Sequence, residues 1–214
     1  MPRSVDSATA IVSLRVHTDL AAWRSIGLTV GADGLARIGK SGLELIDASP
    51  AGLVGWTLVS TFGDVGNVVI DGLDTCLVPV SAAATDQAAQ DEFGATLIDH
   101  VVVMTPSLDR TCGAIAEVTG APLKRIREVG RGVRQGFHRL GEVIVEVVER
   151  PDILADTPAC FWGLVLIVDD LPRVADRLGP SVMGPVKAAV QPGRLIATVR
   201  DEAGLGLPVA LMSP

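Results

Sequence analysis

Residues 97–108 read LIDHVVVMTPSL, a run of strand-forming residues that carries one histidine and then breaks at a proline. Such a run is typical of a buried strand, and Pro106 is favourable at the first position of a following helix. The same design returns at residues 161–171, which read FWGLVLIVDDL. A strand that leads directly into a helix start, twice in one half of the chain, predicts an internal repeat.

The segments that follow each helix start repeat as well. We expect a helix over 106–118 with Thr105 as its N-cap, then three short strands separated by glycine turns, at 123–129, 133–140 and 142–149. After the second repeat we expect a helix at 170–178 and strands at 194–200 and 207–212. This half of the chain therefore predicts two βαβββ modules in tandem and an α+β fold.

The first half looks like a shortened version of the same plan. It predicts one helix at 19–26 and strands at 10–16, 34–38, 43–46, 53–59, 65–70 and 75–80, with little room for a second helix. Residues 81–95 are rich in Ala, Gln and acidic residues and are expected to form a linker. The predicted organisation is a reduced, divergent domain over 1–80, the linker, and a domain of two modules over 96–214.

Composition limits the classes of function. The chain has 214 residues, of which 48% are hydrophobic, but it has no Tyr and only four Phe, so the predicted core is aliphatic. A net charge of −7 argues against a nucleic-acid surface, which needs clustered cations. One local basic cluster could face either an anionic ligand or the solvent: Lys124, Arg125, Arg127, Arg131, Arg134 and Arg139.

The cysteines and the hydrophobic runs indicate a cytoplasmic protein. Cys76, Cys112 and Cys160 are odd in number and widely spaced in apolar contexts, which fits neither a disulfide framework nor a thiolate metal site. We interpret them as buried thiols in a reducing compartment. No signal peptide is recognisable, and no apolar run approaches the roughly 20 residues that span a bilayer.

Three motifs carry a family resemblance. DHVV at 99–102, VEVVE at 145–149 and VDDL at 168–171, together with the tandem modules, resemble the vicinal oxygen chelate superfamily, which includes glyoxalase, bleomycin-resistance and dioxygenase proteins. The resemblance implies that two modules curl around a cup, with a divalent metal bound by residues of the first and last strand of each module. On that basis His100 and Glu146 are the metal-ligand candidates, and such donors suit Zn, Ni, Mn or Fe.

The second module departs from the family pattern. The resemblance aligns Gly163 with His100 and Ala210 with Glu146, so two of the four expected ligands are missing. A catalytic metal needs about three protein ligands. We therefore expect no resident cofactor, although an incomplete divalent-metal site stays open. In the first half, Ser13 takes the His position and Glu44 the Glu position.

Three further residues are candidates for the ligand pocket. His138 could act as a third metal ligand. Alternation along the strand tests this idea, because Phe137 and His138 must face opposite sides and the apolar Phe137 is expected to face the core. Arg194 could bind a substrate carboxylate, although its QPGR context is also an ordinary turn. Trp162 could stack on a ligand or belong to the core, and His100 could line a pocket without any metal.

Two classes of function follow from the resemblance. The preferred one is a glyoxalase-like protein with a degraded metal site, a pseudoenzyme or bleomycin resistance-like binder that holds a small metabolite or drug-like molecule in the C-terminal cup. The alternative is a metal-dependent lyase, isomerase or dioxygenase that uses His100 and Glu146. The expected partner is a small molecule, with no nucleic acid and no membrane; a homodimer is left open.

Overall fold

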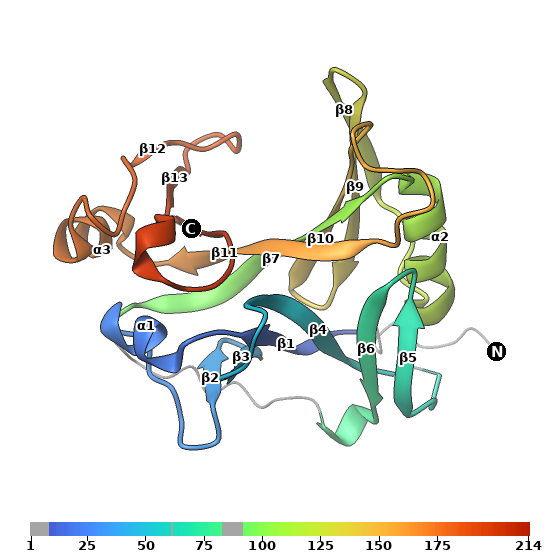
Figure 1. Ribbon diagram of the computed structural model, residues 1–214, viewed down its shortest axis with the longest axis horizontal. Helices are drawn as coiled ribbons and strands as arrows, with labels where there is room; N and C mark the ends of the chain where they lie inside the picture. The colour runs from blue at the N-terminus through green and yellow to red at the C-terminus, as the bar shows by residue number, and fades with distance from the viewer. Residues whose placement is uncertain (1–8, 61, 83–91) are drawn as a thin grey trace.

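The computed structural model describes residues 9–60, 62–82 and 92–214 of the chain. It contains two β-sheets that lie one above the other, with the first half of the chain in one and the second half in the other (Figure 1). No helix among the described residues is long and apolar enough to cross a membrane.

The first half forms a six-stranded sheet of order β2-β3-β1-β4-β6-β5. Its elements are β1 (Ile11–His17), α1 (Leu20–Ser25), β2 (Leu35–Ile38), β3 (Ser41–Ile46), β4 (Gly52–Val59), β5 (Gly66–Ile70), β6 (Leu73–Val78) and a 3-10 turn η1 (Val80–Ala82). Between β4 and β5, the described residues 60 and 62–65 contain no helix. The helix and the strands of this half lie within a few residues of the predicted ranges. Of the expected linker, residues 83–91 lie outside the described residues.

The second half forms an eight-stranded sheet of order β12-β13-β14-β11-β7-β10-β9-β8. Its first module consists of β7 (Ala95–Thr105), α2 (Leu108–Thr119), β8 (Arg125–Gly130), β9 (Val133–Leu140) and β10 (Val143–Glu149). Its second module consists of β11 (Cys160–Val168), α3 (Leu171–Leu178), β12 (Lys187–Ala188), β13 (Leu195–Thr198), the 3-10 turn η2 (Asp201–Ala203) and β14 (Val209–Met212). The α+β class and the tandem βαβββ modules are confirmed.

The start of α2 differs from the prediction. Ser107 is the N-cap, and its hydroxyl accepts a hydrogen bond from the Arg110 N–H at 3.4 Å. Thr105 instead accepts one from the Ser107 N–H at 3.0 Å and so closes the turn between β7 and the helix. Ser and Thr are both favoured N-cap residues, so residue type alone left both positions open.

The helix starts and the strand registers together show which residues of the two modules of the second half correspond. In the antiparallel pair β7–β11, His100 lies opposite Val165 and Val102 lies opposite Gly163. The helices α2 and α3 begin at Leu108 and Leu171, and the same offset makes Gly163 the counterpart of His100, in agreement with this register. In the parallel pairs, Val102 lies beside Glu146 and Val165 beside Ala210, so Ala210 is the counterpart of Glu146.

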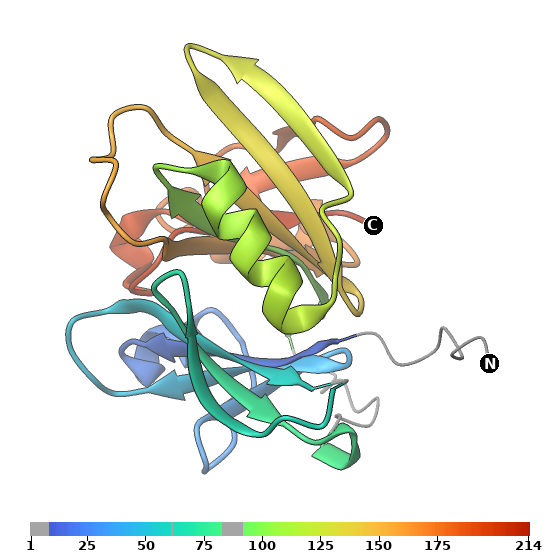
Figure 2. The ribbon, with the colours of Figure 1, turned by 90° about the vertical axis from the view of Figure 1, so that its right-hand side faces the viewer.

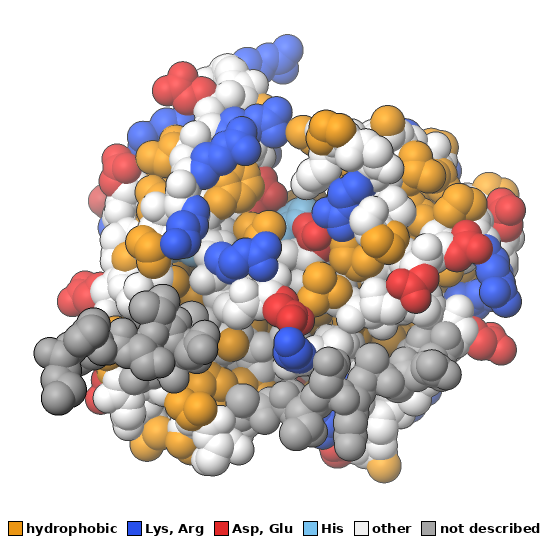
Figure 3. Space-filling model, turned by 180° about the vertical axis from the view of Figure 1, so that it is seen from behind, with side chains coloured by type: hydrophobic (Ala, Val, Ile, Leu, Met, Phe, Trp, Pro, Cys, Tyr) orange, Lys and Arg blue, Asp and Glu red, His pale blue; other side chains and the backbone are white. Residues whose placement is uncertain are grey.

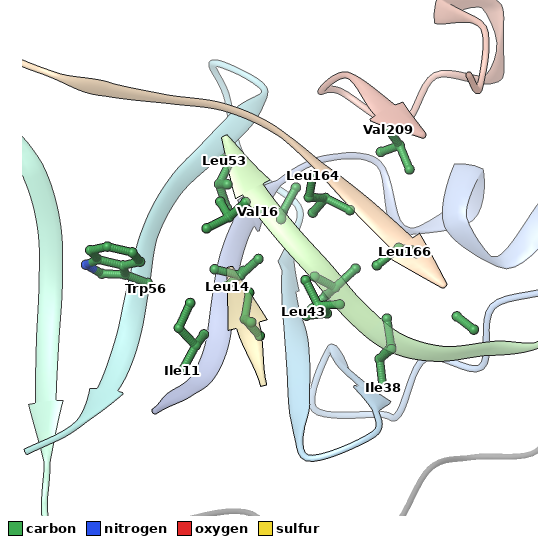
Figure 4. Close-up of a cluster of buried hydrophobic side chains, with 14 of the residues drawn as sticks. Ile11, Leu14, Val16, Ile38, Leu43, Leu53, Trp56, Leu164, Leu166 and Val209 are labelled. Carbon is green, nitrogen blue, oxygen red and sulfur yellow. The ribbon is translucent and has the colours of Figure 1, made fainter. Parts of the chain in front are cut away.

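One hydrophobic core joins the two sheets. Figure 4 shows Leu14 and Leu43 of the first sheet close to Leu164 and Leu166 of β11. Trp56 of β4 packs edge-on against Phe161, with ring centroids 5.1 Å apart. The helix α2 lies beside the first sheet against β9, β10 and β5 (Figure 2). One face of the eight-stranded sheet is therefore covered, and its opposite face carries the cavities described next.

Candidate functional site

The uncovered face of the eight-stranded sheet holds two adjoining cavities, which together we call the cup. The larger cavity has a volume of about 1040 Å³ and lies between strands β8–β10 and the segment 187–192. The smaller has about 350 Å³ and lies over β7, β11 and β14. Both are lined by His100, Gln135, Glu146 and Ile196, so they form one continuous site. Figure 3 shows this face as a hollow in which histidine and acidic side chains are visible.

His100 and Glu146 lie side by side at the junction of the two cavities. They come from the neighbouring parallel strands β7 and β10, and His100 Nε2 is 3.5 Å from Glu146 Oε2. The other carboxylate oxygen of Glu146 accepts a hydrogen bond of 2.6 Å from the Gln135 side-chain amide. The two predicted ligand residues thus share one cavity, with Gln135 as a neighbour that the sequence analysis did not identify.

A β-bulge brings Asp99 to the imidazole of His100. In the β7–β11 register, His100 pairs with Val165 and Ile98 with Leu166, so Asp99 is an extra residue without a cross-strand partner. A bulge bends the strand locally and can turn two consecutive side chains toward each other. Asp99 Oδ2 lies 2.7 Å from His100 Nδ1.

Arg194 holds Asp99 from the other side. Its Nη1 donates to Asp99 Oδ1 at 3.1 Å, and its Nε donates to the Ser213 carbonyl at 2.8 Å. Both contacts of the Arg194 guanidinium are therefore with groups of the protein. Arg194 is not among the residues that line either cavity, and its contact with a ligand carboxylate stays a prediction.

The two carboxyl groups on either side of His100 are shifted in opposite directions. Burial raises the pKa of Asp99, but the hydrogen bond and charge of His100, and then those of Arg194, outweigh it and leave that pKa below its ordinary value. Burial raises the pKa of Glu146 above its ordinary value, because it outweighs the opposing charges of His100 and Arg127. Ionised Asp99 can only accept a hydrogen bond, so Nδ1 of His100 donates to it and Nε2 faces Glu146.

His138 lies on the other face of the sheet. It pairs with buried Val145, whereas Phe137 pairs with Glu146 and lines the cup. The expectation that Phe137 faces the core is wrong, because the register of β9 against β10 sets the faces. His138 is nevertheless among the residues that line the larger cavity. Its Nδ1 lies 3.0 Å from the Ala121 carbonyl, and burial, partly opposed by that carbonyl, lowers its pKa.

Trp162 stands at the mouth of the smaller cavity. It is 49% exposed, unlike Trp23 and Trp56, which are buried in the core. The structure therefore places Trp162 where the ligand-stacking alternative requires it.

The residues present do not complete the donor set of a catalytic metal. A Cβ built on Gly163, the counterpart of His100, would lie 2.4 Å from the Pro208 carbonyl oxygen, so no side chain fits there without a backbone shift. Ala210, the counterpart of Glu146, has no donor atom. Among the described residues, no three His, Cys, Asp or Glu are grouped so that they could hold a metal ion. His100 and Glu146 alone fall short of three donors.

Solved structures resemble this fold. A triple mutant of 4-hydroxymandelate synthase from Streptomyces coelicolor matches 97% of this chain and 93% of its own, with 14% identity and a TM-score of 0.65. A fusion of a xylose isomerase-like TIM barrel with 4-hydroxyphenylpyruvate dioxygenase matches the whole chain over 50% of its own length, with 12% identity and a TM-score of 0.64.

Shorter structures match about half of the chain. One is methylmalonyl-CoA epimerase from Mycobacterium tuberculosis, which covers 56% of this chain and 89% of its own at 17% identity and a TM-score of 0.46. No protein-family model matches the sequence, and no curated protein matches it either. At these identities the similarity shows the fold, and the function must be argued from the residues of the cup.

Proposed function

Because the chain has the vicinal oxygen chelate fold, we propose that it binds a small organic molecule in the cup of the eight-stranded sheet. The observation that carries the proposal is the convergence of His100 Nε2 and Glu146 Oε2, 3.5 Å apart, where the two cavities meet. Small-molecule pockets typically occupy about 300–1,000 Å³ and combine apolar walls with a few polar groups. The two cavities, of about 1040 and 350 Å³, lie at the upper and lower ends of this range, and the smaller one has mainly apolar walls.

The polar groups at the junction favour an occupied cup. Burying a carboxylate is costly unless it is fully hydrogen-bonded, and burial already raises the pKa of Glu146. Among the described residues, the buried carbonyl oxygen of the Gln135 side chain has no hydrogen-bond partner. A ligand with a hydroxyl or amide group would supply the missing bonds to both residues.

Ligand-observed NMR with a mixture of fragment-sized aromatic and aliphatic carboxylates, amides and alcohols tests the proposal. Ala210→Trp fills the smaller cavity, which Ala210 lines, and should abolish the saturation-transfer signals that the wild type gives. Ala155→Trp, on an exposed loop, is the matched control and should keep them. Signals that persist in Ala210→Trp would place binding outside the cup and contradict the proposal.

A second candidate function is proton transfer on the bound molecule, and the Asp99–His100 contact favours it. Asp99 orients the imidazole, and the carboxyl groups of Asp99 and Glu146 have pKa values shifted apart. Such divergence is typical of sites that use one group as a base and another as an acid. Incorporation of solvent deuterium into a bound fragment, lost in His100→Gln while binding persists, is the expected result. Binding without exchange would leave only the binding function.

A reducing cytoplasm is the compartment that we propose. Cys76, Cys112 and Cys160 are all free thiols, and burial raises the pKa of Cys112 to about 11, which keeps it unreactive. The prediction that all three are buried holds for Cys112 only, since Cys76 is half-buried and Cys160 is exposed. The homodimer stays a prediction.

A further inference from the structure

We infer that the ligand of the cup is an amphipathic anion, whose apolar part lies against Trp162 and whose negative group lies against the basic residues of β8. The inference rests on the proposed function and names the class of molecule that the site takes. It follows from the unequal distribution of charge and apolar surface between the two cavities.

The larger cavity is basic. Five of its lining residues are cationic and only Glu146 is acidic; the cations are Lys124, Arg125, Arg127, Arg139 and Lys187. The chain as a whole has a net charge of −7, so this wall has the opposite sign to the rest of the protein. Figure 3 shows Lys and Arg side chains gathered around the border of the hollow. A concave wall of one sign focuses the electrostatic potential and attracts ions of the other.

The geometry of β8 directs two of these arginines toward the cup. Arg125 lies opposite Phe137 and Arg127 opposite Gln135 in the antiparallel pair β8–β9. Directly opposed residues share a face of the sheet, and both Phe137 and Gln135 line the cup. Arg127 is also close enough to Glu146 to lower that group's pKa against the effect of burial.

In the described residues, these cations are not held in ion pairs by the protein. Within the described part of the chain, no ion pair involves Lys124, Arg125, Arg127 or Lys187. Arg134 of the same sequence cluster does pair with Glu149 and Asp109, on the side away from the cup. Two adjacent guanidinium groups without partners suit the oxygens of a carboxylate, sulfonate or phosphate.

The smaller cavity is apolar. Apart from the junction residues and Thr198, its walls are aliphatic side chains, a proline and Trp162, among them Val102, Met104, Val148, Val165 and Ala210. Trp162 is about half exposed at its mouth, and a ligand that covered the indole would remove this apolar surface from water. The carboxylate of Glu146 lies between the two cavities and repels an anion there. The negative group is therefore expected at β8 and the apolar group at Trp162.

Fluorescence titration with a matched pair of probes tests the inference. Anilinonaphthalene sulfonate carries an anionic group, and its parent phenylnaphthylamine has the same rings without charge. We expect the sulfonate to bind the wild type at least about tenfold more tightly, and Arg125→Gln/Arg127→Gln to remove that preference. Arg24→Gln/Arg173→Gln is the matched control. It replaces two exposed arginines of α1 and α3 and so changes the net charge by the same amount. This variant should keep the preference for the sulfonate.

Each outcome of this experiment separates the inference from the proposed function. Equal affinity for both probes, or a preference that survives Arg125→Gln/Arg127→Gln, would overturn the anionic class. If the neutral probe is nevertheless lost in Ala210→Trp, the cup binds small molecules and only the inference fails. If both probes persist in Ala210→Trp, binding lies elsewhere and both proposals fail. Displacement of the sulfonate by phenylbutyrate or by phenyl phosphate then distinguishes a carboxylate from a phosphate ligand.

Discussion

The orientation of the His100 imidazole is set by one extra residue in strand β7. Without the bulge, Asp99 and His100 would face opposite sides of the sheet. With it, the carboxylate reaches Nδ1 at 2.7 Å, and Arg194 fixes the carboxylate in turn. Nε2 is the nitrogen that is left to meet a ligand in the cup.

Asp99→Asn should change the tautomer of His100. In the wild type we expect the neutral ring to carry its proton on Nδ1, because ionised Asp99 can only accept. An amide can donate as well as accept, so the variant should show both tautomers in long-range proton–nitrogen NMR spectra. Loss of the charged bonds to His100 and Arg194 should also cost about 1.5–3 kcal/mol of unfolding free energy. Asp109→Asn, away from the cup, is the control, and an unchanged Nδ1–H form in Asp99→Asn would contradict this account.

The purified protein should hold divalent metals only weakly. His100 and Glu146 offer two donors, Ala210 offers none, and the Pro208 carbonyl closes the position of Gly163. With most of its first shell left to water, a bound Zn, Ni or Mn ion should be lost on dialysis. Elemental analysis is the measurement. About one equivalent retained by the wild type and lost in His100→Ala would contradict the prediction.

At the scale of the elements, Glu149 joins the end of β10 to the start of α2. It accepts hydrogen bonds from Arg134 at 3.0 and 2.7 Å and from the Leu108 N–H at 2.6 Å. The carboxylate therefore satisfies a free N–H at the helix N-terminus, where the helix dipole also favours negative charge. This contact fixes the helix against the strand that carries Glu146.

Glu149→Gln should destabilise the protein by about 1–2 kcal/mol at neutral pH. The hydrogen bond from Arg134, with a smaller contribution from Leu108, lowers the pKa of Glu149 against the effect of burial. A lowered pKa means that this stabilisation is present above the ordinary value of about 4.3 and is lost as the pH falls below it. Chemical denaturation should show that the difference in unfolding free energy between Glu149→Gln and wild type is smaller at acid pH than at neutral pH.

Glu142→Gln is the matched control for Glu149→Gln. The carboxylate of Glu142 forms a half-exposed pair with Lys40 at 2.7 Å, which is worth less than about 1 kcal/mol. Two results would contradict this account of the junction between β10 and α2. One is that Glu142→Gln loses as much unfolding free energy as Glu149→Gln. The other is that the effect of Glu149→Gln does not depend on pH.

The local sequence pattern predicts where strands lie but not how they pair with one another. Apolar runs and glycine turns located almost every strand within a few residues, because most strands bury at least one face, although β8 is exposed throughout. The face of His138 depends on the register of β9 against β10, and the contact between Asp99 and His100 depends on a bulge against β11. Neither register is encoded in the local pattern. The two-residue strand β12 is too short to show any periodicity.

At the scale of the whole molecule, the two halves share their core. Leu14, Leu43 and Trp56 of the first sheet belong to the same buried cluster as Leu164 and Leu166 of the second. The first sheet therefore supports the back of the sheet whose front forms the cup. Residues 1–80 and 96–214 were predicted as separate domains, and this shared core makes cooperative unfolding of both halves the expectation.

Trp56→Ala tests that cooperativity. Trp56 is fully buried and contacts Phe161 across the interface, so its truncation should cost about 3–5 kcal/mol. If the halves unfold together, hydrogen-exchange protection should fall by the same amount in β10 of the second sheet as in β3 of the first. Trp162→Ala removes an equally large but half-exposed side chain and should change protection little. Protection that falls in β3 while β10 keeps its wild-type value would show instead that the halves are independent domains.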